Sequence, residues 1–224
     1  MTTRVILEPV MVLHHRPFQN SSLLLELFSQ QYGRVKAIAR SARGPKSRYK
    51  GYLQVFSPLL VSWSGRRELM NINQVELHGL PYPLNGQSLL CAFYLNELLL
   101  RLLPHDDPYP EIFAEYCAAL QALAQADNVA VILRRFEKRL LDHLGYGLSF
   151  AVNAENYYQW LPDQGFLRCD HSTGEQLFLG RSLLALQAEK WDNPEDLIAA
   201  KRLMRLVIGQ HLGNKPLKSR ELLC

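Results

Sequence analysis

The spacing of apolar residues changes near residue 80, and this change limits the folds that the chain can adopt. Before it, β-branched, Leu and aromatic residues gather in short segments separated by Pro, Asn and Gly, which is typical of strands joined by turns. These segments are residues 10–14, 22–28, 34–40, 59–63 and 69–77. Five short strands within the first eighty residues favour a small closed barrel over a sandwich.

Beyond residue 85, apolar residues recur at the spacing of helices. Helices are predicted over residues 87–103, from residue 110, over about 128–144 and over 194–212. The last has a clear start, because Asn193 suits the cap position and Pro194 suits the first turn. Residues 148–180 combine paired aromatics with turn formers and predict an irregular loop or hairpin insertion. The sequence therefore predicts a β module followed by a helical body, with a boundary in the Pro-rich stretch 80–85.

Basic residues are concentrated in the amino-terminal module. Residues 1–80 hold eleven Lys/Arg against four Asp/Glu, whereas residues 81–224 hold fourteen against seventeen. No acid occurs between Leu27 and Arg67, and residues 33–50 alone carry seven cations. Ordinary surfaces mix both signs of charge, so this asymmetry points to a face that binds a polyanion, with nucleic acid as the leading candidate.

The cations of this segment are spaced as on a surface that follows a phosphate backbone. Arg34, Lys36 and Arg40 share even parity, so on a strand they project from one face. Gly44 and Pro45 end the strand, and further cations continue among aromatic rings, as in proteins that bind single strands without sequence preference. The predicted DNA contacts are Arg34, Lys36, Arg40, Arg43, Lys46, Arg48, Lys50 and Tyr52. The alternative is a solvated positive face whose aromatics pack inside the barrel.

Other classes of protein fit the sequence less well. No apolar run is long enough to cross a bilayer, and the amino terminus lacks the pattern of a secretory signal. The four cysteines lie far apart without a CxxC pair, which argues against a zinc ribbon and against disulfides. Adjacent His14 and His15 would point to opposite faces of a strand, and the chain has no Walker loop, nucleophile elbow or HExxH motif. We therefore expect a cytoplasmic protein that is not an enzyme.

Several stretches of the chain together resemble the RecO family of bacterial DNA-repair proteins. The resemblance covers nearly the whole chain in the same order, which makes the set specific although each stretch alone is weak. The stretches are HHRPFQNSSLLLELFSQQYGRVKAIARSARGPKS, LQVFSPLLVSW, NELLLRLLP, LRRFEKRLLDHLGYG and GNKPLKSREL.

This resemblance implies an α+β, multidomain fold: an amino-terminal OB-fold β-barrel (residues 1–80) and an α-helical carboxy-terminal domain (residues 81–224). It implies DNA repair and homologous recombination, with binding of single- and double-stranded DNA and annealing of complementary strands. Family members also act with RecR to load RecA on DNA coated by single-stranded DNA-binding protein (SSB). No cofactor and no catalytic residue is implied, and the protein is expected at the nucleoid. Some members hold a four-cysteine zinc module in the region 148–180; only Cys169 lies there, so no metal is predicted.

The stretch LRRFEKRLLDHLGYG combines an apolar stripe with four cations. The resemblance suggests that this region receives the acidic, apolar carboxy-terminal tail of SSB, through Arg134, Arg135 and Leu144. The alternative is that Leu144 is a core residue and that the arginines form ion pairs on the helix, for instance with Glu137.

Two other functions stay open at this point. One is a general single-stranded nucleic-acid-binding OB-fold protein, acting on RNA for example, without an SSB partner; a preference for RNA would favour it. The other is a protein-interaction scaffold, which predicts no affinity for nucleic acid at all.

Overall fold

The computed structural model describes residues 3–66, 69–125, 128–148, 151–162, 164–170, 176–213 and 216–221. The chain forms two compact units, one of Met1–Ala126 with Leu217–Cys224 and one of Asp127–Pro216.

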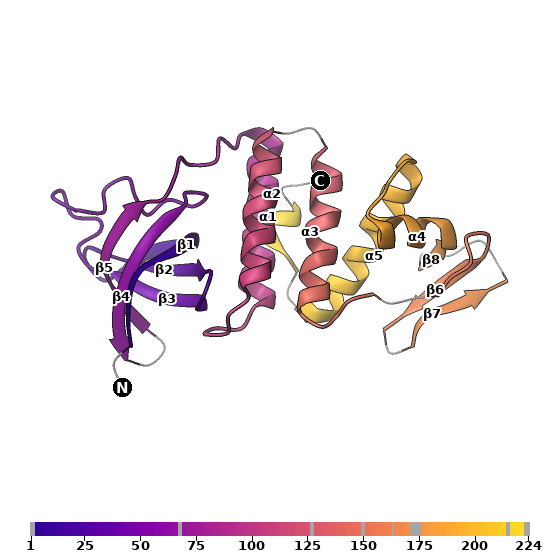
Figure 1. Ribbon diagram of the computed structural model, residues 1–224, viewed down its shortest axis with the longest axis horizontal. Coiled ribbons are helices and arrows are strands. Elements are labelled where there is room, and N and C mark those ends of the chain that lie inside the picture. Colours follow the sequence, from indigo (N-terminus) through magenta and orange to yellow (C-terminus); the bar gives the residue numbers. More distant parts are fainter. Residues whose placement is uncertain are drawn as a thin grey trace. The chain divides into compact units, whose positions relative to one another are not determined.

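Five strands of the first unit close into a barrel (Figure 1). They are β1 (Thr3–Phe18), β2 (Ser22–Ser29), β3 (Gly33–Ala39), β4 (Leu59–Arg66) and β5 (Leu69–Leu77). The order around the barrel is β1-β2-β3-β5-β4, and only the β3–β5 pair is parallel. This small Greek-key barrel confirms the predicted OB-like fold.

Strand β1 is far longer than the predicted segment 10–14, because it pairs with β4 through its first half and with β2 through its second half. The register shifts between Val5 and Glu8 and again between Val12 and His14. Such bulges bend a strand, so one continuous strand can serve two neighbours in a closed barrel.

Alternate residues of the strands fill the barrel. Trp63 is the largest fully buried side chain, with 1% of its surface exposed. The core also contains Val5, Val10, Val12, Leu25, Leu27, Val35, Ala37, Ala39, Tyr49, Leu53, Leu59, Val61, Met70 and Ile72. The barrel therefore has an interior packed with side chains, and its binding capacity must lie on its outer surface and loops.

Three helices belong to the same unit as the barrel: α1 (Gly86–Leu102), α2 (Pro110–Gln125) and α6 (Lys218–Glu221). Buried Asn96 joins α1 to the barrel, because its amide donates to the Leu13 carbonyl at 2.8 Å. The Tyr116 hydroxyl of α2 donates in turn to the Asn96 side chain. These two helices are therefore part of the unit that contains the barrel, and the predicted domain boundary at residue 80 stays a prediction.

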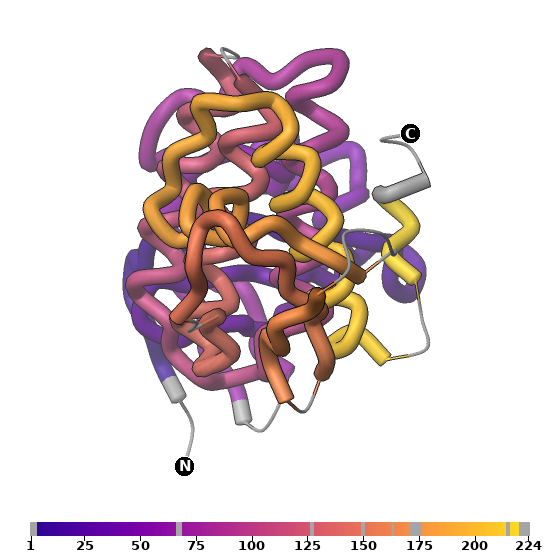
Figure 2. The backbone as a smooth tube through the Cα atoms, turned by 90° about the vertical axis from the view of Figure 1, so that its right-hand side faces the viewer, coloured from indigo at the N-terminus to yellow at the C-terminus, as the bar shows by residue number. Residues whose placement is uncertain are grey.

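The second unit contains α3 (Val129–His143), α4 (Gly180–Ala188), α5 (Pro194–Leu212) and a small antiparallel sheet. The strands of this sheet are β6 (Tyr157–Leu161), β7 (Gly165–Cys169) and β8 (Leu177–Leu179), in the order β7-β6-β8. Figure 2 traces this part of the chain by colour, from orange in the sheet to yellow in α5. The hairpin alternative for residues 148–180 is thus found in β6 and β7, and β8 adds a third strand that was not expected. Tyr158 and Trp160 alternate with more exposed neighbours along β6.

Candidate nucleic-acid interface

The loop between β3 and β4 begins with a strongly basic stretch, residues 40–50, which we call the basic loop. All five of its cations have exposed side chains: Arg40, Arg43, Lys46, Arg48 and Lys50. Among the residues that the structure describes, none of the five lies within ion-pair distance of a carboxylate. Their charge is therefore available to an outside anion.

Arg43 ties the basic loop to the turn between β1 and β2. Its guanidinium donates to the carbonyls of Gln19 at 2.7 Å, Asn20 at 2.9 Å and Ser22 at 3.1 Å. Its backbone N–H donates to the Ser21 carbonyl at 2.8 Å. These four bonds hold the first part of the basic loop against the turn, which lowers the ordering cost of binding there.

The two tyrosines in and after the basic loop, Tyr49 and Tyr52, differ in burial. Tyr49 is buried and its hydroxyl donates to the Ile72 carbonyl at 3.1 Å, while Arg48 lies over its ring at 4.8 Å. Tyr52 is half-buried, so part of its ring remains accessible to a nucleobase. Tyr49 thus anchors the loop, as the alternative interpretation of the sequence expected for the aromatics, and Tyr52 is the stacking candidate.

Lys36 and Arg40 extend the positive surface along β3. Arg40 is exposed and its Nε donates to the Asn71 side chain at 3.1 Å. The side chain of Lys36 is 38% exposed, and its ammonium lies 3.8 Å from a carboxylate oxygen of Glu26. Lys36 is therefore partly neutralised, whereas Arg40 belongs with the basic loop.

Arg34 does not fit its predicted role as a DNA contact. Only 8% of it is exposed, and its Nη1 donates to the carbonyls of Leu100 at 2.7 Å and Leu103 at 2.6 Å, at the end of α1. Its Nη2 donates to Glu26 at 3.2 Å. Even parity puts Arg34 and Lys36 on the same face of β3. At Arg34, however, this face is covered by the end of α1. Arg34 holds α1 against the barrel instead.

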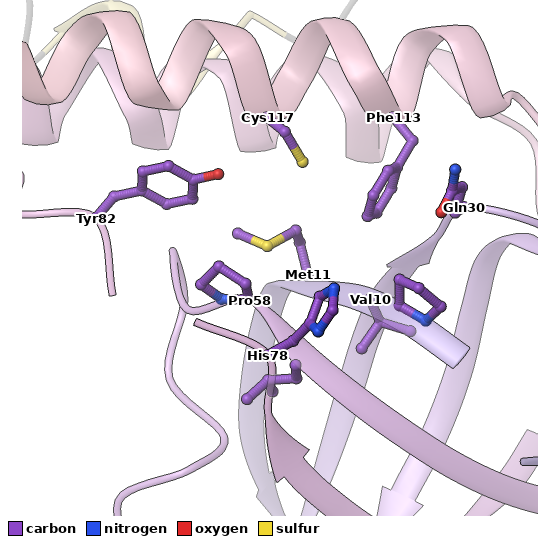
Figure 3. A pocket seen from close by; sticks show the side chains of 10 residues that line it. Val10, Met11, Gln30, Pro58, His78, Tyr82, Phe113 and Cys117 are labelled. Atoms are coloured by element: carbon purple, nitrogen blue, oxygen red, sulfur yellow. The ribbon is translucent and has the colours of Figure 1, made fainter. Parts of the chain in front are cut away.

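A pocket of about 310 Å³ lies between the barrel and α2 (Figure 3). Its lining residues are Pro9, Val10, Met11, Gln30, Pro58, Leu59, His78, Tyr82, Phe113 and Cys117. Burial, together with the neighbouring Cys117, raises the pKa of Tyr82 to about 12, and burial raises the pKa of the Cys117 thiol to about 11 despite its hydrogen bond with Tyr82. Both groups are therefore neutral near pH 7. Because none of these lining residues is a Lys, Arg, Asp or Glu, the pocket does not suit a phosphate.

The residues predicted to bind the SSB tail lie on α3 and at its end, in the second unit. Arg134 is buried and its guanidinium donates to buried Glu137, one helical turn away. Leu144 is the half-buried cap residue at the end of the helix. Arg135 is 45% exposed and lies 3.2 Å from Glu189. The structure therefore gives Arg134 the ion pair of the alternative interpretation, and it leaves Arg135 nearer the surface.

Glu189 collects three cations of α3, a group that sequence reasoning missed. Arg139 donates to both of its carboxylate oxygens, at 3.1 and 2.9 Å, and Lys138 lies at 3.6 Å, besides Arg135. Burial alone would raise the pKa of Glu189, but the hydrogen bonds and charges of these cations outweigh it and lower that pKa. No spacing rule could pair α3 with a residue about fifty positions further along the chain.

In the parts of the chain that the structure describes, no group of three or more His, Cys, Asp or Glu side chains could hold a metal ion. None of the described helices is long and apolar enough to cross a membrane.

Two family profiles match the chain, one over each part of it. The family profile "Recombination protein O N terminal" matches residues 2–81, and "Recombination protein O C terminal" matches residues 84–221. The chain is similar to the DNA repair protein RecO of Coxiella burnetii, with 53% identity over 231 residues that cover both chains completely. It is similar to the DNA repair protein RecO of Photobacterium profundum, with 43% identity over 224 residues, 96% of this chain and 94% of the relative.

Proposed function

The chain belongs to the RecO family of DNA repair and recombination proteins, and we propose that it binds single- and double-stranded DNA through its barrel and anneals complementary strands. The observation that carries this proposal is the basic loop, whose five exposed cations have no carboxylate partner among the described residues. Cations of this kind on a small Greek-key barrel suit the phosphate backbone of a nucleic acid.

The proposed mechanism is electrostatic. Arg40, Arg43, Lys46, Arg48 and Lys50, with a smaller contribution from Lys36, bind phosphates and release counterions. Neutralised strands repel each other less, so two of them can be held close enough for bases to pair. Base pairing supplies the sequence specificity, and Tyr52 offers one stacking surface that accepts any base. No catalytic step is part of this mechanism.

We further propose that the helical unit receives the acidic carboxy-terminal tail of SSB at α3. Arg135 and Leu144 are accessible at least in part, and a guanidinium next to an apolar residue suits a peptide that has both carboxylates and an apolar end. Arg134 would support the site from inside through its pair with Glu137. With SSB held there, the protein would act with RecR to load RecA on coated strands.

The test of DNA binding is a double variant, Lys46→Ala with Lys50→Ala. If the five cations of the basic loop contact a single strand, the slope of log affinity against log salt is about −3.5, and removing two of them makes it shallower by about 1.4. Annealing of naked complementary strands slows with the loss of affinity. Lys190→Ala with Lys201→Ala removes the same charge from exposed positions of the second unit and is the matched control.

Unchanged DNA affinity and annealing in the Lys46/Lys50 variant would contradict the assignment of the basic loop. Tighter binding of RNA than of DNA, with no binding of the SSB tail, would favour a general nucleic-acid-binding protein instead.

A further inference from the structure

Three polar side chains form a row across the outer face of the barrel. They are Asn71 on β5, Ser64 on β4 and Arg4 on β1, and we call them the polar row. The strand registers place Ser64 directly opposite both Asn71 and Arg4. The residues next to them in sequence belong to the barrel core: Val5, Trp63, Met70 and Ile72. Since side chains alternate along a strand, all three members of the polar row point outward.

The polar row begins where the basic loop is attached to β5. Arg40 Nε donates to the side-chain oxygen of Asn71 at 3.1 Å, and the Tyr49 hydroxyl donates to the Ile72 carbonyl at 3.1 Å. Two hydrogen bonds to neighbouring residues of β5 therefore hold the basic loop beside the row. The two surfaces are continuous, with Asn71 at the junction.

Each member of the polar row can donate to a phosphate. The oxygen of Asn71 is taken by Arg40, which leaves its amide nitrogen for an outside acceptor. Ser64 and Asn73 hydrogen-bond each other at the surface, at 2.9 Å. Arg4 is exposed, and among the described residues no carboxylate pairs with it. Amides and hydroxyls contact nucleic-acid backbones, and a guanidinium matches a phosphate with two parallel bonds.

The acids of these strands lie away from the polar row. The described residues of β1, β4 and β5 include two acids, Glu8 and Glu76. Glu8 is buried, where it accepts from the Ser29 hydroxyl at 2.8 Å. Glu76 is exposed but pairs with Leu60, four residues from Ser64 and so about 13 Å along β4. A polyanion is therefore repelled from the far end of the strands and not from the row.

We propose that a single DNA strand bound at the basic loop continues along the polar row, and that Arg4 is a further phosphate contact at the end of this path. The inference deepens the proposed function and rests on it for the ligand. Three strand spacings separate β3 from β1 in the order β3-β5-β4-β1, about 14 Å of barrel surface. A strand that covers only the basic loop therefore ends before Arg4, and a longer one reaches it.

The test compares probe lengths in the full-length protein and in Arg4→Ala. Fluorescence anisotropy follows labelled oligothymidylates of about 5 and about 16 nucleotides, near the limits for one OB-fold. Affinity for the long probe should fall several-fold, and its slope of log affinity against log salt should become shallower by about 0.7. Affinity for the short probe should not change. Arg205→Ala removes the same charge from an exposed position of α5 and is the matched control.

A second substitution, Lys50→Ala, separates this inference from the proposed function. It removes a cation of the basic loop and should weaken both probes. If it does so while Arg4→Ala changes neither, the polar row is rejected and the basic loop is retained. If the unsubstituted protein binds neither probe, the proposed function itself is contradicted.

Two other results would overturn the inference. Equal weakening of the short and long probes by Arg4→Ala would mean that Arg4 acts through the general field of the barrel, without a contact at the end of a path. An equal loss in Arg205→Ala would mean that net charge alone explains the change.

Ser64→Asp tests the middle of the path without removing a cation. Its carboxylate would lie opposite Arg4 and repel phosphates, so affinity for the long probe should fall at least as far as in Arg4→Ala. The short probe should lose less. An unchanged affinity for the long probe would contradict a strand that crosses β4 at this point.

Discussion

A guanidinium that leaves water needs several acceptors, and Arg34 finds them at the end of α1. Lys50 carries the same charge but lies exposed in the basic loop without a described carboxylate partner. The two residues illustrate why charge alone does not define a binding surface. Burial and neighbouring acceptors decide whether a cation supports the fold or remains available to a ligand.

Replacement of Arg34 should therefore affect stability, and replacement of Lys50 should affect binding. Arg34→Ala leaves Glu26 and two carbonyls without their donor and is expected to lower the free energy of unfolding by about 2–4 kcal/mol. Lys50→Ala is expected to change it by less than about 0.5 kcal/mol. Urea unfolding of both variants checks this, and a fully stable Arg34→Ala protein would contradict the structural role.

Gly33 allows a close approach that no other residue permits. Its φ is +63°, and a Cβ at this position would lie 1.8 Å from the Asp107 carbonyl oxygen in the loop between α1 and α2. Gly33→Ala should destabilise the protein by more than about 3 kcal/mol, since left-handed strain and a collision with backbone add up. Gly51→Ala separates the two effects: its φ is +83° but nothing lies within 4 Å, so about 1 kcal/mol is expected. Equal melting temperatures of the two variants would contradict this, because they would mean that the contact with Asp107 adds nothing to the loss of stability.

At the scale of elements, the short helix α6 depends on one carboxylate of α1. Glu97 accepts hydrogen bonds from the backbone N–H groups of Lys218, at 3.0 Å, and Ser219, at 2.8 Å, and from the Ser219 hydroxyl. Burial alone would raise the pKa of Glu97, but these bonds and the charge of Arg101 outweigh it and lower that pKa. The ionised form is therefore the one that holds α6.

The attachment of α6 should be lost in acid. Because the folded pKa of Glu97 lies below its unfolded value, the stabilisation is complete above about pH 4.5 and disappears as the pH falls through the folded pKa. Glu97→Gln should remove it at all pH values, with faster amide hydrogen exchange at Lys218 and Ser219. Glu155→Gln, at an exposed carboxylate of the other unit, is the control. Equal protection of both amides in Glu97→Gln would contradict this attachment.

Much of the architecture could be predicted from local pattern. Apolar spacing located the main helices, and the segments between turn formers located the barrel strands, since both depend on near neighbours in sequence. The β6–β7 hairpin was one of the two expected forms of residues 148–180, but the bulges of β1 and the pairing of β8 with β6 were missed because they depend on more distant strands. For the same reason the basic loop was visible in the sequence, whereas the burial of Arg34 and the pairing of Glu189 were not.

At the scale of the whole molecule, positive charge is concentrated in the barrel, and the α3 cations Arg135, Lys138 and Arg139 lie in the other unit. DNA is the proposed ligand of the first unit, and the acidic tail of SSB is the proposed ligand of the second. Each function should therefore respond to substitutions in its own unit.

Arg135→Ala tests this separation. It should leave the annealing of naked strands unchanged and slow the annealing of SSB-coated strands several-fold, because only the coated strands present the acidic tail. Rates are compared by the fluorescence of labelled complementary oligonucleotides. Equal slowing on naked and coated strands would mean that Arg135 contacts DNA directly.

We propose that the barrel binds DNA strands by their phosphates and that the helical unit binds the tail of SSB. Annealing of complementary oligonucleotides, with and without the cognate SSB, at about 50 and about 200 mM salt, tests it most directly. Annealing should fall steeply with salt and should persist on SSB-coated strands. Annealing that ignores salt, or that SSB blocks completely, would contradict it.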